Sequence, residues 1–309
     1  MKKIAISIGD LNGIGIQLAL ENHETIKKII EPLYCIDKKM LQQASELLDI
    51  PIPSDFKTVK KIAKKFSIEP AKVTKESGVY SFASFLKAVE LSKMQEVDGI
   101  MTLPIHKKAW ELAGVNFKGH TDALRELFFA PAIMMLGSPK MYVALYTEHI
   151  PLNQVHEEVK NVKKLSEFLI DFYENIKDTL KEDETIGLLG LNPHAGDDGV
   201  LGDEEIQINE ARGIAHKALG KEAYTSPLVP DVAFTPNARK NHRYFVAMYH
   251  DQGLAPLKAL YFDEGINISL NLPIIRTSVD HGTAFDIAYK NVELNNLSYL
   301  NALNYFVTT

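Results

Sequence analysis

Residues 4–30 read IAISIGDLNGIGIQLALENHETIKKII, and this stretch indicates the fold class. Ile4 to Ile8 is a short apolar run typical of a buried strand, and Ile14 to Ile30 repeats apolar residues at helical spacing. A polar, glycine-rich turn from Gly9 to Gly15 joins them. Strand, turn and helix in this order form the repeating unit of α/β proteins, in which helices cover both faces of a sheet.

The same alternation continues along the chain. Further strands are predicted at Leu33–Ile36, Gly99–Leu103, Ala132–Leu136, Met141–Tyr146, Glu184–Leu191, Tyr244–Tyr249 and Ile266–Leu270. Helices are predicted at Met40–Leu48, Gly78–Met94, Val155–Leu180, Ala284–Lys290 and Leu297–Phe306. Apolar strands that alternate with helices predict a mainly parallel sheet. The functional sites of such sheets gather at the carboxyl ends of the strands.

Composition and charge narrow the function classes. The 309 residues are 46% hydrophobic, which is core material for two domains or for one large α/β unit. A net charge of -6 and a pI near 6.0 exclude a global basic field that would recruit nucleic acid. The lysine-rich run from Lys57 to Lys65 carries Val59, Ile62 and Phe66 at helical spacing, so we expect a solvated helix face there.

The same evidence bears on the compartment. A single cysteine, Cys35, rules out an internal disulfide and fits a reducing compartment. The apolar start of the chain ends at Gly9, which is too early for a signal peptide. No stretch approaches the roughly 20 apolar residues of a membrane span. We therefore expect a cytoplasmic protein without nucleic-acid or membrane partners.

Three histidines follow strand-like runs, in the motifs Thr147-Glu148-His149, Asn192-Pro193-His194 and Tyr249-His250-Asp251. Three imidazoles at strand ends can hold one divalent metal and leave positions open for substrate. The motifs lie far apart in sequence, so each histidine taken alone could be structural. Nitrogen ligands suit Zn²⁺, Co²⁺ or Ni²⁺, whereas Mg²⁺ prefers carboxylates, for which Asp251 and Asp231 are candidates. Asp251 could instead orient His250.

Two further polar groups are candidates for holding an anion. Gly119-His120-Thr121-Asp122 precedes a helical run, with Thr121 as the predicted N-cap, and the start of a helix offers free N–H groups. Arg276 follows four apolar residues, and Lys258 and Asn267 complete the second group. A guanidinium in that setting needs a protein carboxylate or a ligand phosphate. A capped helix and a structural salt bridge are the alternatives.

The glycine-rich turn from Gly9 to Gly15 follows a strand and opens a helix, as a phosphate-binding loop does. It is not G-x-G-x-x-G, and Asp37 is only a weak match for a ribose-binding acid, so we expect no standard Rossmann site. A structural role for the turn is the alternative. In the polar segment from Ser278 to Ala288, Gly282 permits close approach of the backbone to a ligand. Asp286 could accept from sugar hydroxyls or interact with a helix dipole.

Taken together, five motifs resemble those of the 4-hydroxythreonine-4-phosphate dehydrogenase family, in order and over nearly the whole chain. They are Gly9-Asp10…Gly13-Ile14-Gly15, Gly119-His120-Thr121-Asp122, Asn192-Pro193-His194-Ala195-Gly196, Tyr249-His250-Asp251-Gln252-Gly253 and the segment from Arg276 to Ala284. The resemblance implies oxidation of 4-phosphooxy-L-threonine with NAD, followed by decarboxylation, in pyridoxal 5'-phosphate biosynthesis. Two rival functions stay open. The chain could be a paralogous dehydrogenase of 4-phosphothreonate-type sugar acids, or a histidine-metal hydrolase or lyase.

The resemblance also implies a fold. It predicts an isopropylmalate dehydrogenase-like α/β protein with two interleaved domains and a cleft between them, not a standard Rossmann fold. Residues 1–122 with 265–309 would form the nucleotide side, and residues 123–264 would carry the metal ligands and the dimer contacts. The family is a homodimer with its active site at the subunit interface, so the same assembly is expected here.

The functional residues of the family can be carried over one by one. The metal ligands fall on His149, His194 and His250, with zinc, cobalt or magnesium as the expected metal. The substrate contacts fall on His120, Thr121, Lys258, Asn267 and Arg276. Contacts to NAD or NADP are expected at Gly13, Gly15, His281, Gly282, Ala284 and Asp286, whose segments resemble the nucleotide-binding segments of the broader isocitrate and isopropylmalate dehydrogenases. Asp251 and Lys258 are candidates for the catalytic base. Leu11-Asn12 stands where the family usually has Pro-Ala, which leaves every proposed ligand intact.

Overall fold

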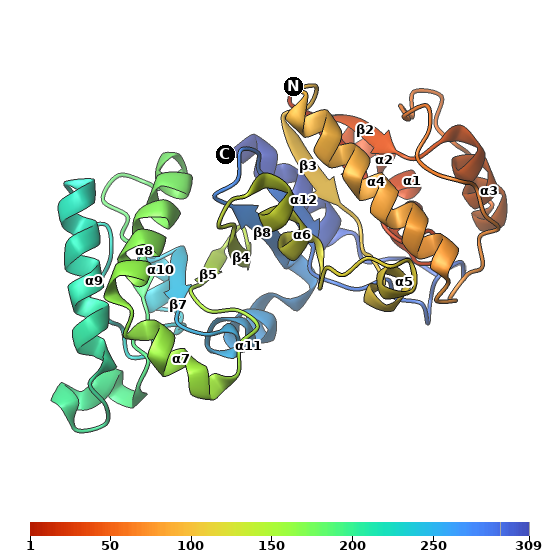
Figure 1. Cartoon of the computed structure of the whole chain (residues 1–309). Coiled ribbons are helices and arrows are strands. Elements are labelled where there is room, and N and C mark those ends of the chain that lie inside the picture. Colours follow the sequence, from red (N-terminus) through yellow and green to blue (C-terminus); the bar gives the residue numbers. More distant parts are fainter. Residues whose placement is uncertain (291, 309) are drawn as a thin grey trace. The chain divides into compact units, whose positions relative to one another are not determined.

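The computed structural model describes residues 1–290 and 292–308, and the chain divides into two compact α/β units (Figure 1). Unit 1 comprises residues 1–130, 266–268 and 272–308, and unit 2 comprises residues 131–265 and 269–271. The sequence-based border falls after Asp122, whereas the chain leaves unit 1 after Ala130. The difference arises because the helix that begins at His120 packs into the core of unit 1 through Ala123 and Leu124.

Unit 1 is built on parallel strands in the order β2-β1-β3-β9. These are β1 (Lys3–Ser7), β2 (Glu31–Cys35), β3 (Gly99–Thr102) and β9 (Arg276–Val279). Strand β8 (Ile266–Leu270) is divided between the two units. The residues of β3 and β9 are buried throughout, as expected for strands covered on both faces.

The helices of unit 1 follow the strands in the predicted alternation. They are α1 (Gly15–Glu21), α2 (His23–Ile26), α3 (Lys38–Leu48), α4 (Lys75–Lys93), α5 (Lys107–Leu112), α6 (His120–Phe128) and α12 (Leu297–Thr308). The α3 helix begins at Asp37, whose carboxylate accepts from the backbone N–H groups of Lys39 and Met40. Thr74 caps α4 in the same way. Side-chain caps of this kind satisfy the free N–H groups of a first helical turn.

Unit 2 has strands in the order β4-β5-β7-β6. Strands β4 (Ile133–Ser138) and β5 (Met141–Leu145) form the predicted antiparallel hairpin. Strands β5, β7 (Tyr244–Ala247) and β6 (Gly187–Leu188) are parallel neighbours, so their carboxyl ends lie at one edge of the sheet. The three histidine motifs lie at this edge.

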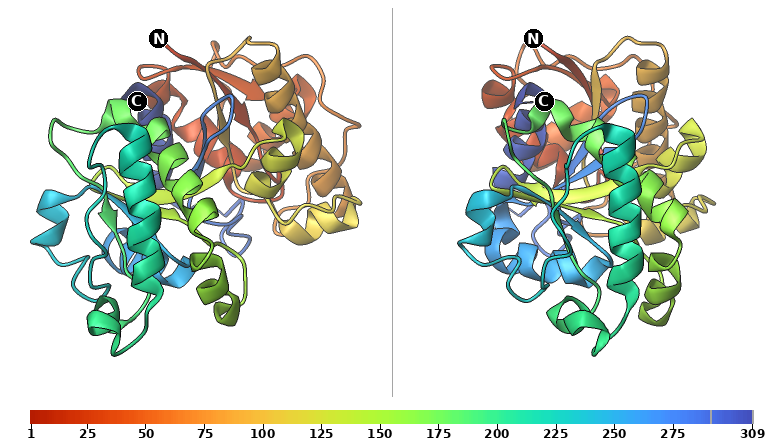
Figure 2. Two further views of the ribbon diagram at one scale, coloured as in Figure 1. Left: turned by 60° about the vertical axis from the view of Figure 1, so that its left-hand side comes forward. Right: turned by 90° about the vertical axis from the view of Figure 1, so that its left-hand side faces the viewer.

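The helices of unit 2 are α7 (Leu152–Val159), α8 (Val162–Ile176), α9 (Glu204–Leu219), α10 (Ala238–Asn241) and α11 (His250–Tyr261), with short 3-10 segments η1 (Lys177–Thr179), η2 (Pro193–Gly199) and η3 (Phe262–Glu264). Helices α8 and α9 lie side by side (Figures 1 and 2). Helix α11 packs on β5 and β7. No helix in residues 1–290 and 292–308 is both long and apolar enough to cross a membrane.

Three predictions of helix are wrong. Val155–Leu180 is two helices, because α7 ends at Val159 and the side chain of Asn161 caps α8 by accepting from the N–H of Lys164. The Lys57–Lys65 run is not helical, because Thr58 forms a parallel bridge with Tyr34 of β2. Ala284–Lys290 is a series of turns, in which Ala284 and Tyr289 have φ angles of 45° and 57°.

Candidate active site

The three histidine motifs of unit 2 follow neighbouring strands. His149 lies after β5, His250 after β7 and His194 after β6, and these strands run parallel in that spatial order. The ring centroids of His149 and His250 are 5.6 Å apart. The fold therefore brings together at one sheet edge three segments that are far apart in sequence.

Hydrogen bonds join the loops that carry these histidines. Gln252 donates through Nε2 to the carbonyl of Gly190 at 2.7 Å, and its Oε1 accepts from the N–H of Met248 at 2.7 Å. The hydroxyl of Thr147 donates to the carbonyl of Met248 at 2.6 Å. Gln252 thus joins the loops after β6 and β7, and Thr147 joins the loops after β5 and β7.

The loop of His194 is held by a buried acid. Glu205 accepts through Oε1 from the backbone N–H groups of Leu191 at 2.7 Å and Asn192 at 2.9 Å. Residues 194–198 all have positive φ angles, from 46° to 84°. Left-handed backbone costs roughly 1–2 kcal/mol for each residue other than glycine, so the surrounding contacts must stabilise this loop. The side chain of His194 is exposed.

In the part of the chain that the structure describes, the ligand atoms of the three histidines do not all lie within 4.8 Å of one another. His149 is also exposed, and the side chain of His250 is 38% exposed. Asp251 lies 2.6 Å from Nδ1 of His250 through Oδ1, which leaves Nε2 of the ring for another ligand. Lys258, one of the candidate bases, places Nζ 5.8 Å from the ring centroid of Phe262.

In unit 1, Arg276 and His120 form a buried basic group. Arg276 is 2% exposed and donates to the hydroxyl of Thr102 through Nε at 3.0 Å and Nη2 at 2.5 Å. Burial lowers the pKa of Arg276 to about 9. Burial, and then the charge of Arg276, hold the pKa of His120 well below its usual value. A guanidinium that is shielded from water binds an anion strongly.

Several buried polar atoms of the predicted site have no hydrogen-bond partner within the described chain. They include Nε2 of His120, Oδ1 of Asn267 and Nε2 of His281. Buried polar groups are normally satisfied, so each of these atoms points to a ligand or a water. Nδ1 of His106 is in the same condition, and its ring stacks on Phe285 with centroids 5.0 Å apart. No sequence motif marks His106, so it was not among the predicted site residues.

Thr121 is not the cap of α6, contrary to the prediction. The helix begins at His120, its N-cap is Gly119, and Thr121 lies buried in the first turn. The carboxylate of Asp122 instead accepts from the N–H of Lys118 at 3.0 Å and closes the loop before the helix. Because Gly119 has no side chain to accept from the helix, the first-turn N–H groups have no side-chain cap there.

The two segments assigned to the cofactor lie side by side. The N–H of Ile14 donates to the carbonyl of Thr283 at 3.1 Å, and a Cβ on Gly13 would lie 2.7 Å from that oxygen. A Cβ on Gly15 would lie 3.1 Å from the carbonyl of Ile8. Protein atoms therefore fill the space at both glycines, which supports the structural role of this turn. A Cβ on Gly282, in contrast, would meet nothing within 4 Å.

The unusual Asn12 has a clear role in this turn. Its side chain donates to the carbonyl of Lys72 at 2.8 Å and accepts from the N–H of Glu69 at 2.9 Å. It thereby fastens the turn to the segment before α4. The neighbouring Asp10 is fully buried and accepts from the hydroxyl of Ser77 at 3.1 Å, and burial raises its pKa to about 6.

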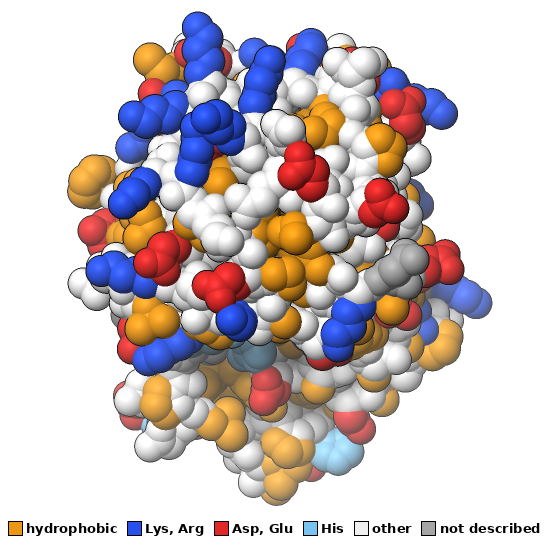
Figure 3. Space-filling model, turned by 90° about the vertical axis from the view of Figure 1, so that its right-hand side faces the viewer, with side chains coloured by type: hydrophobic (Ala, Val, Ile, Leu, Met, Phe, Trp, Pro, Cys, Tyr) orange, Lys and Arg blue, Asp and Glu red, His pale blue; other side chains and the backbone are white. Residues whose placement is uncertain are grey.

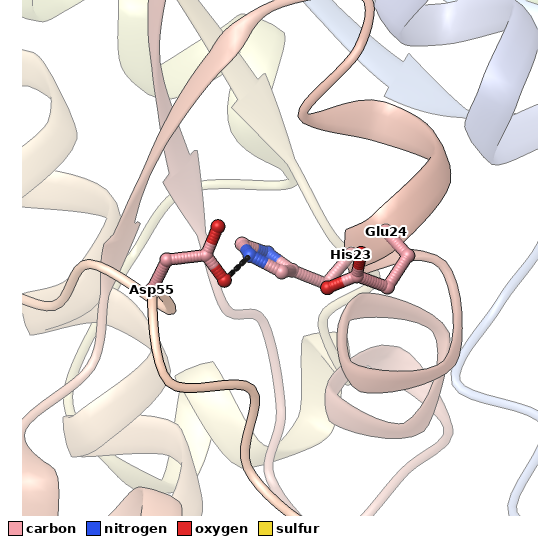
Figure 4. Close-up of side chains that lie close together, drawn as sticks. All are labelled: His23, Glu24 and Asp55. Atoms are coloured by element: carbon pink, nitrogen blue, oxygen red, sulfur yellow. Dashed lines mark hydrogen bonds and ion pairs between the residues drawn. The ribbon is translucent and has the colours of Figure 1, made fainter.

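Another cluster of potential metal ligands lies in unit 1, formed by His23, Glu24 and Asp55 (Figure 4). Nε2 of His23 is 3.2 Å from Asp55, and Nδ1 is 2.9 Å from the hydroxyl of Tyr34. Both carboxylates already bind the ammonium of Lys27, at 2.9 and 3.0 Å. Because a cation is already supplied by the chain, we interpret the cluster as an ion-pair network. The sequence gives no signal for it.

These features define an α/β enzyme of the isopropylmalate dehydrogenase-like fold: the strand order, the histidines at strand ends and the buried basic group. A β-decarboxylating dehydrogenase from Thermococcus kodakarensis, in its apo form, has this fold with a TM-score of 0.50 at 13% identity, covering 98% of this chain and 82% of that chain.

Closer relatives identify the family. The model of the family described as "Pyridoxal phosphate biosynthetic protein PdxA" matches residues 28–306. The 4-hydroxythreonine-4-phosphate dehydrogenase of Sulfurimonas denitrificans is 55% identical over 301 residues, which cover 97% of this chain and 95% of that protein. The crystal structure of the Klebsiella pneumoniae enzyme of the same name has a TM-score of 0.85 at 29% identity, with 100% of both chains covered. The chain therefore belongs to the PdxA family and is an oxidoreductase, and a dehydrogenase of this kind requires a nicotinamide cofactor.

Proposed function

We propose that the enzyme oxidises 4-phosphooxy-L-threonine with NAD or NADP to 2-amino-3-oxo-4-phosphooxybutanoate. This β-keto acid then loses CO₂ to give 3-amino-2-oxopropyl phosphate, as a step of pyridoxal 5'-phosphate biosynthesis. The observation that carries the proposal is the placement of His149, His250 and His194 at the ends of three adjacent parallel strands, with two of the rings 5.6 Å apart. The full-length likeness to named dehydrogenases supports the substrate class.

The donor set fits a divalent metal. Three imidazoles are the usual ligands of zinc or cobalt in sites that keep a position open for substrate, whereas magnesium prefers oxygen donors. Asp251 contacts Nδ1 of His250 and so presents Nε2 outward. A bound cation of this kind supplies Lewis acidity, which lowers the pKa of an alcohol and stabilises enolate charge.

The residues of the chain would bind the substrate and move its proton. Arg276, with the neutral imidazole of His120 beside it, would hold an anionic group of the substrate. Oδ1 of Asn267 would accept from the substrate amine or hydroxyl, which gives this buried oxygen its missing partner. We assign Thr121 to substrate binding as well. Lys258 or Asp251 would take the alcohol proton as the hydride passes to the nicotinamide.

We further propose that the enzyme is a homodimer with its active site at the subunit interface. The three histidines are wholly or partly exposed in one protomer and do not converge within 4.8 Å. A second copy that packs against this edge would exclude water and supply further contacts. Metal-dependent dimer formation, measured by sedimentation with and without a chelator, tests this assembly.

The central experiment is the substitution His194→Ala. We expect loss of bound metal and a fall of at least about 100-fold in NADH formation with 4-phosphooxy-L-threonine, because a ligand is removed. His156→Ala is the matched control, since His156 is a half-exposed histidine on α7 that pairs with Glu157. Full metal content and normal turnover in the His194→Ala variant would reject the ligand assignment.

A second assay decides the substrate. The enzyme is assayed in parallel with 4-phosphooxy-L-threonine and with 4-phosphothreonate. Of the two compounds, only 4-phosphooxy-L-threonine carries the amine. We expect a higher kcat/KM for the amino substrate. The opposite preference would assign the chain to the oxidation of phosphorylated sugar acids. Absence of NADH with both substrates would reject both substrate assignments.

A further inference from the structure

A cavity lined mainly by lysines lies at the carboxyl end of β2 in unit 1. Its volume is about 340 Å³, and it is lined by Asp37, Lys60, Lys61, Ala63, Lys64 and Lys65. This volume falls within the range of roughly 300–1,000 Å³ that is usual for small-molecule sites. Its position fits as well, because ligands of open α/β sheets bind beyond the carboxyl ends of the strands. We name residues 60–65 the lysine arch.

The lysine arch is fixed at both ends rather than free in solvent. Before it, the N–H of Val59 donates to the carbonyl of Tyr34 in β2 at 3.2 Å. After it, Gln43 of α3 donates to the carbonyl of Phe66 at 3.1 Å and accepts from the N–H of Ile68 at 2.5 Å. Within it, Ile62 packs against the core of unit 1. The four ammonium groups are therefore carried on a held segment.

These lysines have no counter-charge within the described chain. Lys60, Lys61, Lys64 and Lys65 form no ion pair with any described residue, whereas exposed lysines nearby do, as Lys57 does with Glu31 and Lys72 with Glu69. The face drawn in Figure 3 shows lysine and arginine side chains gathered in its upper part. In a chain with a net charge of -6, such a local excess of positive charge is unexpected.

The one acid that lines the cavity is already engaged. Asp37 accepts from the hydroxyl of Tyr80 at 2.8 Å and from the N–H groups of Lys39 at 3.2 Å and Met40 at 3.3 Å. Its carboxylate caps α3 and is only 3% exposed, so it cannot neutralise four ammonium groups. Like charges on a held segment repel one another, and a bound anion would offset this repulsion.

We propose that this cavity binds a small anion that carries more than one phosphate group. Four lysines around one cavity exceed what a single phosphate needs, and ammonium groups bind phosphate oxygens as point charges. No residue that the resemblance assigns to metal, substrate or cofactor lines the cavity. The ligand is either a free polyphosphate or the phosphates of a phosphorylated dinucleotide, and the two share the same chemistry.

The test is titration of the intact enzyme with inorganic pyrophosphate, followed by calorimetry. One variant carries Lys60→Gln, Lys61→Gln, Lys64→Gln and Lys65→Gln. Its control carries Lys28→Gln, Lys181→Gln, Lys217→Gln and Lys240→Gln, four exposed lysines elsewhere, so that both have the same net charge. We expect saturable binding by the wild type and the control, weakened about tenfold or more in the arch variant and by added salt. Equal binding by all three proteins, or no saturable binding by the wild type, would overturn the proposal.

A kinetic comparison then distinguishes the two sources of the ligand. If the cavity receives the phosphate groups of the dinucleotide, the arch variant raises the KM values for NADP and for NAD about tenfold. If the ligand is a free polyphosphate, both KM values stay as in the wild type while pyrophosphate binding is lost. Thermal unfolding of the arch variant serves as the folding check, and the pair Lys60→Gln with Lys64→Gln replaces it if folding fails.

Discussion

The guanidinium of Arg276 donates twice to one oxygen, the hydroxyl of Thr102, through Nε at 3.0 Å and Nη2 at 2.5 Å. Thr102 lies in β3 and Arg276 in the adjacent β9, and both side chains are almost completely buried. This contact fixes the direction of the charge. If Arg276 holds an anionic group of the substrate, as proposed, Thr102 is its positioning residue.

The substitution Thr102→Val removes the hydroxyl and keeps the shape. A hydrogen bond to a charged group contributes about 1.5–3 kcal/mol, so we expect the KM for the phosphorylated substrate to rise by roughly tenfold or more. The value of kcat should change less, because in the proposed role Arg276 binds the substrate and does not react. Thr102→Ser keeps the hydroxyl and should restore the KM. A valine variant with an unchanged KM would show that Arg276 does not contact the substrate.

A pair of glycine substitutions separates structural and ligand roles in the cofactor segments. Gly13→Ala would place a Cβ 2.7 Å from the carbonyl of Thr283, and such overpacking costs about 1–3 kcal/mol of unfolding free energy. Gly282→Ala meets nothing within 4 Å, so stability should stay within about 0.5 kcal/mol. If Gly282 approaches the dinucleotide, its variant nevertheless raises the KM for NAD. Normal kinetics for Gly282→Ala would remove that residue from the site.

Much of the fold follows from local patterns that the structure confirms. The apolar runs at β1, β3, β7 and β8 are strands, because short apolar segments bounded by polar turns have few alternatives in a covered parallel sheet. The prediction that the three histidine loops follow strands is therefore confirmed. The exact geometry of His194 was not predictable, because its backbone is left-handed and the acid that holds the preceding residues, Glu205, lies eleven residues further along the chain.

The helix expected at residues 57–65 is wrong because of contacts made in the folded chain. Apolar residues at helical spacing suggested a helix at 57–65, yet Thr58 pairs with β2 and Ile62 packs against the core. Tertiary contacts thus overrode a weak local preference. The His23–Asp55 contact joins residues 32 apart, and the Asn12–Glu69 contact joins residues 57 apart. No pattern in a single sequence marks such pairs, because each residue is ordinary in its own segment.

Asp10 makes stability depend on pH. Burial raises its folded-state pKa to about 6, above the unfolded value near 3.8, so the folded state favours the protonated carboxyl. The stability that this group contributes is complete below the unfolded pKa and is lost as pH rises through 6. We expect Asp10→Asn to stabilise the protein at pH 8, by up to about 3 kcal/mol, and by about 1 kcal/mol less at pH 5.

Urea unfolding of the wild type and of the Asp10→Asn variant at both pH values measures this difference. Asp98→Asn is the control, because Asp98 is an exposed acid that accepts from the N–H of Lys3. A stability difference that is the same at pH 5 and pH 8 would contradict the raised pKa. Activity of the same variant shows whether the carboxyl also serves the neighbouring cofactor segment.

Gln252 gives the sharpest test of the histidine framework. Gln252→Leu leaves the carbonyl of Gly190 and the N–H of Met248 without their partner, so the loops after β6 and β7 lose their connection. Residues that orient metal ligands typically account for about 10–100-fold in affinity, and we expect a loss of that size in metal binding. Gln252→Glu keeps the acceptor for Met248 and should lose less. Gln154→Leu, at an exposed position on α7, is the control. Metal affinity that is unchanged in Gln252→Leu would mean that His194 and His250 do not bind the same ion.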